Sequence, residues 1–168
     1  MIEVNEQVDV EAPPRAVWDL LSNPRAVVDC VPGASLGEQQ EDGRYDATVT
    51  VKFGPAKVTF KAKVALEFDA AAMTGKVSTT GKDTQGGTRM SGSMTFKVLE
   101  RAEPPSGSTV PIEAAVEVTG KLAMLVESGA KLVVKRMTTE FSERLAARFA
   151  GPSGTPLTAA DNNPGRAD

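Results

Sequence analysis

The chain has 168 residues, with 19 Lys and Arg, 22 Asp and Glu, one Cys and no His. The lack of histidine excludes a Ser-His-Asp triad, a Cys-His pair and a histidine-ligated zinc site, and the single cysteine excludes an internal disulfide and a multi-cysteine metal site. The formal net charge of −3 gives no general attraction to nucleic acid, so no nucleic-acid partner is predicted.

Apolar and polar residues alternate at the start of the chain, which predicts a half-buried strand over residues 2–11. Pro13 ends this strand, and Pro14 can begin a short helix because its missing N–H costs nothing in the first turn. Ser22-Asn23-Pro24 stops that helix and caps a second short one. Glu6 is the one acidic residue whose place in the alternation faces inward.

From Ala34 to about Lys121 the same alternation predicts antiparallel strands joined by turns. Gly54-Pro55 and Gly86-Gly87 suit tight reversals of the chain. Together with the first strand they make a sheet of about seven strands. The best-defined strands of this part are predicted at residues 44–53, 56–68, 75–84, 88–101 and 109–120.

After residue 121 the spacing of apolar residues changes to three or four, which predicts a long amphipathic helix from about Leu122 to Phe149. At ~1.5 Å per residue this helix would be roughly 40 Å long, enough to cross a whole sheet. The predicted fold is therefore α+β, with a curved antiparallel sheet wrapped around a C-terminal helix. Residues 1–149 would form this domain, and the polar residues 150–168 a disordered tail.

Short motifs make the chain resemble a known family. The segment Val17-Trp18-Asp19-Leu20-Leu21-Ser22-Asn23-Pro24, followed by Cys30-Val31-Pro32-Gly33-Ala34, is similar to the "VWxLLxDP … CxPG" pattern of the CoxG family of carbon monoxide dehydrogenase subunits. That family belongs to the START-like, helix-grip (SRPBCC) superfamily. Gly120-Lys121-Leu122-Ala123 and Phe141 resemble its "GxLA … FF" region, whereas Asn23 stands where the family usually has Asp.

The resemblance implies an accessory protein of a molybdenum-containing carbon monoxide dehydrogenase, rather than an enzyme. Such proteins are thought to help seat the dehydrogenase at the cytoplasmic membrane, where its electrons enter the respiratory chain. The sequence has no signal peptide and no membrane-spanning stretch, so the expected location is the cytoplasm or, peripherally, the cytoplasmic face of the membrane. The superfamily fold implies a cavity for apolar ligands, and the partner's role suggests an isoprenoid quinone (menaquinone or ubiquinone).

The residues expected between sheet and helix mix large and small apolar side chains with adaptable methionines. This mixture is one way to leave room for a ligand, but the residues alone favour a filled, tapering core. The resemblance favours the ligand cavity. The predicted ligand-binding residues are Val51, Phe53, Val58, Phe60, Ala62, Val64, Met90, Met94, Phe96, Ala114, Val116, Met124, Leu125, Val133, Met137 and Phe141.

Outward-facing cations form a basic stripe on this acidic chain, suited to anionic lipid or an acidic enzyme surface. A merely solvated face is the alternative interpretation. The predicted membrane or partner patch consists of Lys57, Lys61, Lys63, Lys131 and Lys135.

No catalytic residue, metal site or covalent cofactor is predicted. Cys30 has no histidine partner and is expected to be a small buried apolar residue. A cyclase or hydrolase would need an inward acid/base pair, for which only Glu6 and Tyr45 are candidates. The leading hypothesis is a non-catalytic protein that binds a lipid-like ligand, recruits the dehydrogenase to the membrane and delivers quinone. The alternatives are an assembly module with a filled core and a small cavity-based cyclase or hydrolase.

Overall fold

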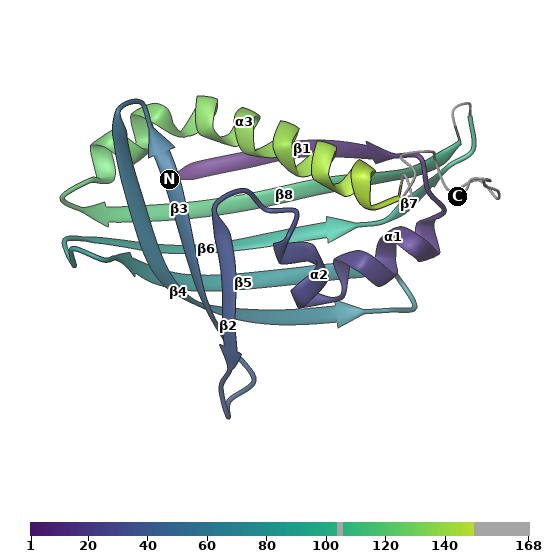
Figure 1. Cartoon of the computed structure of the whole chain (residues 1–168), viewed down its shortest axis with the longest axis horizontal. Coiled ribbons are helices and arrows are strands. Elements are labelled where there is room, and N and C mark those ends of the chain that lie inside the picture. Colours follow the sequence, from purple (N-terminus) through teal and green to yellow (C-terminus); the bar gives the residue numbers. More distant parts are fainter. Residues whose placement is uncertain (104–105, 150–168) are drawn as a thin grey trace.

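The computed structural model describes residues 1–103 and 106–149, so the predicted tail lies outside the described residues. A single sheet carries three helices on one side (Figure 1). The elements in chain order are β1 (Ile2–Val10), α1 (Pro14–Leu21), α2 (Pro24–Val28), β2 (Ala34–Gln39), β3 (Tyr45–Phe53), β4 (Ala56–Asp69), β5 (Thr74–Asp83), β6 (Thr88–Lys97), β7 (Leu99–Arg101), β8 (Gly107–Gly120) and α3 (Ala123–Phe149).

Within the described residues the strands form one antiparallel sheet of eight strands, in the order β1-β8-β6-β5-β4-β3-β2, with β7 paired to β8. The predicted fold class is confirmed. The sheet exceeds the expected seven strands because the predicted strand at 88–101 is divided at Val98. The amide of Val98 donates to the carbonyl of Met73 at 3.0 Å, and its side chain is buried.

The two short helices begin and end as predicted. α1 has Pro14 in its first turn, and the Asn23 side chain caps α2 by accepting from the amides of Arg25 and Ala26. The Arg25 guanidinium then donates to the carbonyls of Leu36 at 3.0 Å and Gly37 at 2.7 Å. These contacts hold α2 against β2, at one edge of the sheet.

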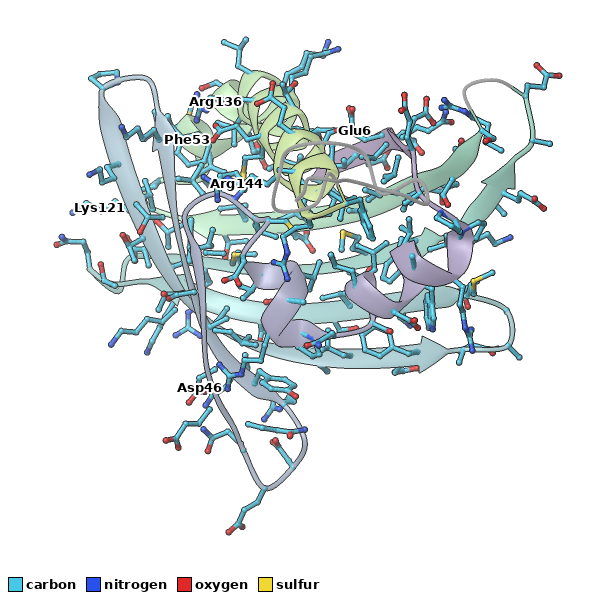
Figure 2. The ribbon with its side chains drawn as sticks, turned by 45° about the vertical axis from the view of Figure 1, so that its right-hand side comes forward. Glu6, Asp46, Phe53, Lys121, Arg136 and Arg144 are labelled. Carbon is cyan, nitrogen blue, oxygen red and sulfur yellow. The ribbon has the colours of Figure 1, made fainter. Side chains whose placement is uncertain are left out.

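The long helix α3 makes its main contacts with β1, β3 and β8. The Leu122 amide, just before the helix, donates to the Thr88 hydroxyl at 2.8 Å. Arg136 donates to the carbonyl of Lys52 at 2.7 Å, where α3 passes the end of β3; Figure 2 labels Arg136 and neighbouring Phe53. Near its C-terminal end Arg148 donates to the carbonyl of Ala26 at 3.4 Å. Among the described residues, no helix is both long and apolar enough to cross a membrane.

The buried core consists of two separate clusters under the helices. One cluster joins α1 and Leu145 of α3 to β1, β6 and β8. It contains Val8, Val10, Ala12, Val17, Trp18, Leu21, Cys30, Phe96, Val98, Val110 and Leu145. The other lies under the N-terminal half of α3 and contains Phe53, Val58, Phe60, Val118, Val126 and Val133.

Candidate functional site

The strand register places the predicted inward residues of the sheet on one face. Along one row, Ala114 of β8 pairs with Met94 of β6, Met94 with Val77 of β5, and Val77 with Leu66 of β4. Residues two positions apart on a strand share a face, so this row lies on the same side as the buried Val118 and Phe60. That side faces α3, as the sequence predicts.

The two core clusters take up the ends of this inner face but not its middle. Phe53, Val58, Phe60 and Val133 belong to the second cluster, and Phe96 to the first. Partly buried residues packed against one cluster or the other are Val51, Met90, Val116, Leu125, Met137 and Phe141. Ala62, Val64, Met94 and Ala114 belong to neither cluster and remain partly accessible. The predicted ligand-binding residues are thus divided between buried ends and a partly accessible middle.

Met124 is a correction to the predicted set. Its side chain is 85% exposed, whereas Val126 and Val133 of the same helix are buried. Successive residues of an α-helix are about 100° apart, so residues two and nine positions from Met124 lie on the opposite side. Helix positions that share a face recur every three or four residues. Met124 lies two residues before Val126, so it does not share the buried face.

The register also adds inner-face residues that are not in the predicted ligand-binding set. Leu66, Val77 and Thr79 lie in the middle of the face and are partly accessible. Val77 and Thr79 belong to β5, which is rich in Gly, Ser and Thr. Its apolar and polar residues alternate too weakly to predict which side chains face inward. Only the pairing to neighbouring strands identifies them.

The acid/base candidates Glu6 and Tyr45 are not brought together. Glu6 is also not the one inward acid, because Asp83 pairs with Phe60, is buried on the inner face and accepts from the Thr88 amide at 3.1 Å. Glu6 pairs with Ile112 and Tyr45 with Val64, so both have inner-face positions. They belong to β1 and β3, with four strands between them in the sheet order, and no hydrogen bond joins them. In the part of the chain that the structure describes, no group of three acidic or cysteine side chains could hold a metal ion.

Cys30 has a structural place in the first core cluster, where it is 1% exposed. Burial raises the pKa of its thiol, and nearby Asp29 acts in the same direction, while Arg148 and Arg144 partly oppose the shift. The reactive thiolate is therefore disfavoured at neutral pH, in line with the expectation of a small buried residue.

The predicted basic patch is divided between opposite sides of the sheet. Lys57, Lys61 and Lys63 alternate with the inner-face residues of β4 and thus lie on its outer face, whereas Lys131 and Lys135 belong to α3 on the inner side. Lys63 also forms an ion pair with Asp46, which Figure 2 shows on the β2–β3 side of the sheet. A flat surface cannot meet both groups of lysines at once, because the sheet separates them.

Comparison with solved structures supports the fold. A conserved protein from Geobacillus kaustophilus is 18% identical, with a TM-score of 0.67, and the match covers 86% of this chain and 95% of that one. The Zhui aromatase/cyclase from Streptomyces sp. R1128 is also 18% identical, with a TM-score of 0.58 and coverage of 92% and 98%. A START superfamily protein from Mycobacterium smegmatis is 15% identical, with a TM-score of 0.53 and coverage of 85% and 96%. These similarities show the fold alone.

No curated protein matches the chain. The model of the CoxG family, which is described as a subunit of carbon monoxide dehydrogenase, matches residues 7–150, most of the sequence. The matched region contains both short motifs, strands β2 to β8 and all of α3. The chain therefore belongs to the CoxG family, and this membership implies an accessory role with a carbon monoxide dehydrogenase.

Proposed function

We propose that this protein is a non-catalytic accessory protein of a carbon monoxide dehydrogenase that holds a lipid-like ligand between its sheet and α3. The divided core is the observation that carries the proposal. A domain of this size would ordinarily bury one continuous core. Here the middle of the inner face consists of apolar residues that neither cluster covers, including Leu66, Val77 and Met94.

The chemistry of this middle strip favours an apolar ligand. Apolar surface removed from water contributes about 25 cal/mol per Å², so a hydrocarbon chain laid along these side chains would be stabilised. A charged ligand would lose its hydration there without gaining a partner. An isoprenoid quinone combines a long apolar tail with redox chemistry, which suits a protein that serves an electron-donating dehydrogenase. The electron chemistry would then belong to the ligand and the partner enzyme.

Ala114→Phe should remove ligand binding without a large loss of stability. The new ring would occupy the partly accessible strip beside Met94, so we expect the free energy of unfolding to stay within about 1 kcal/mol of the wild type. Native mass spectrometry and lipid extraction of the purified protein would measure bound quinone, and urea unfolding would measure stability.

The matched control is Ala115→Phe, which adds the same ring one residue along β8 on the outer face. It should retain the ligand. If Ala114→Phe instead destabilises the protein by about 1–3 kcal/mol, as overpacking of a filled core does, the assembly-module alternative is favoured. Wild-type protein from quinone-producing cells that carries no lipid would also contradict the proposal.

Membrane recruitment is the second part of the proposed function, and we assign it to the outward face of α3. Met124 and Leu132 are 85% and 77% exposed, and Lys131 and Lys135 lie on the same side of the helix. Apolar side chains beside lysines are typical of helices that lie on anionic membranes, where each basic residue contributes about 1 kcal/mol. The outer-face lysines of β4 lie on the opposite side of the sheet from α3 and are not part of this surface.

Leu132→Glu should weaken binding to phosphatidylglycerol vesicles roughly tenfold or more, because it replaces an apolar anchor by a repelled charge. Leu99→Glu is the matched control, since Leu99 is also exposed but belongs to β7. Vesicle co-sedimentation of both variants and the wild type would measure the difference. Equal weakening by the two substitutions, or none, would argue against this face.

A further inference from the structure

The outer face of the sheet contains a hollow of about 720 Å³ lined by residues from β2 to β6. Three cations lie in a row along it. Lys61 of β4 pairs directly with Lys82 of β5, and Lys82 pairs with Arg89 of β6. Because neighbouring strands are about 4.8 Å apart, the row concentrates three positive charges within roughly 10 Å.

Nothing in residues 1–103 and 106–149 compensates these charges by an ion pair. Asp46 also lines the hollow, but it is engaged by Lys63, the fourth cation there, and by the Gln40 amide at 2.7 Å. Like charges directly opposite each other on neighbouring strands destabilise a sheet. The row is thus an unfavourable arrangement for the isolated chain, in a protein whose net charge is −3.

We infer that this hollow binds a ligand that carries two phosphate groups. A phosphate monoester has about −1.5 to −2 charges at neutral pH and a phosphodiester about −1, so two phosphates bring about two to four negative charges to a row of three cations, whereas one carboxylate would leave two of them uncompensated. Arg89 can engage a phosphate through two N–H groups, and the lysines act as point charges. Thr48 and Thr80 add hydroxyl groups to the lining.

Two sources share this chemistry: a soluble compound with two phosphate groups, and the headgroup of cardiolipin, a lipid whose two phosphodiesters carry one negative charge each. The site does not depend on the proposed function, because it lies on the side of the sheet opposite to α3 and the apolar strip. A variant of one surface leaves the other unchanged. The proposed phosphate site and the proposed function can therefore fail or succeed separately.

Isothermal titration with inorganic pyrophosphate tests the site directly. The wild type should bind it, and Lys82→Gln/Arg89→Gln should bind at least roughly tenfold more weakly, since two charge-assisted contacts are lost. The matched control is Lys76→Gln/Lys97→Gln, which removes two positive charges from the same strands and the same face. Lys76, the nearer of the two, lies about 20 Å along β5 from Lys82. The control should bind as the wild type does.

Vesicles with and without cardiolipin form the second arm of the experiment. Binding of pyrophosphate but not of cardiolipin vesicles identifies a soluble ligand, and preference for cardiolipin vesicles identifies the lipid; in either case Lys82→Gln/Arg89→Gln must lose the binding. The melting temperature of that variant should not fall, because the substitutions relieve repulsion. If the wild type binds neither probe, or if both double variants bind equally, the row is only a solvated face and the proposal is wrong.

Discussion

Trp18→Ala should lower the free energy of unfolding by about 3–5 kcal/mol, the largest loss expected from any single substitution considered for this protein. Trp18 is 3% exposed in the first core cluster. Its ring centroid lies 5.9 Å from that of Phe68, in an edge-on arrangement, and 6.0 Å from that of Phe96. Removal of the indole would leave a cavity where α1 meets the sheet.

Urea unfolding followed by circular dichroism would measure this loss, since the substitution removes the chain's one tryptophan and its fluorescence. Asp19→Ala is the control because the adjacent Asp19 is exposed on the same helix, and its replacement should change stability by less than about 0.5 kcal/mol. A loss below about 1 kcal/mol for Trp18→Ala would mean that α1 is not anchored through this ring.

Gly33→Ala should destabilise the protein by about 2–4 kcal/mol. Gly33 has a φ of +78°, and a Cβ atom there would lie 2.3 Å from the carbonyl oxygen of Thr50. The carbonyl of Gly33 also accepts from the Thr50 amide at 2.9 Å, so the chain cannot move away without losing that bond. The substitution therefore combines backbone strain with displacement of the start of β2 from β3.

Gly54→Ala separates these two causes. Gly54 also has a positive φ, of +64°, but a Cβ atom there would meet nothing within 4 Å. Gly54→Ala should therefore lower the free energy of unfolding only by the backbone strain, about 1–2 kcal/mol. Thermal unfolding of both variants would measure the difference, and equal losses would show that the close approach of Gly33 to β3 contributes nothing.

Trp18 and Gly33 explain why the short motifs of this chain are informative. In the motif around Val17-Trp18, the tryptophan supplies the bulk that attaches α1 to the sheet. In Cys30-Val31-Pro32-Gly33, the cysteine fills the first cluster and the glycine permits the contact with Thr50. Both motifs therefore serve the fold, and neither brings a reactive group to the middle of the inner face.

The sequence predicted the fold well because each element has a clear local signal. The alternation in β1, β3 and β4, the prolines before α1 and the change of period before α3 are all local properties. The break at Val98 depends on the hydrogen bond that its amide donates to the carbonyl of the distant Met73, and alternation alone cannot reveal such a contact. For the same reason the inner side of β5 was apparent only from its register.

The candidate surfaces were harder to predict because they depend on which segments the fold brings together. The lysines of β4 and α3 share a charge but lie on opposite sides of the sheet. The row formed by Lys61, Lys82 and Arg89 joins strands whose residues are 21 and 7 positions apart (82 − 61 and 89 − 82), so no short sequence window contains it. Met124 is exposed although it is apolar, because its position on α3 faces away from the sheet.

The hydrogen bonds by which three arginines hold the helices in place have a consequence for sequence divergence. Arg25, Arg136 and Arg148 all donate to main-chain carbonyls of β2, β3 and α2. Every residue type carries that acceptor, so replacements at Lys52 or Ala26 would leave each contact in place. Related chains can therefore vary freely at the accepting positions while each arginine is retained, and analysis of correlated substitutions would miss contacts that fix how α3 lies over the sheet.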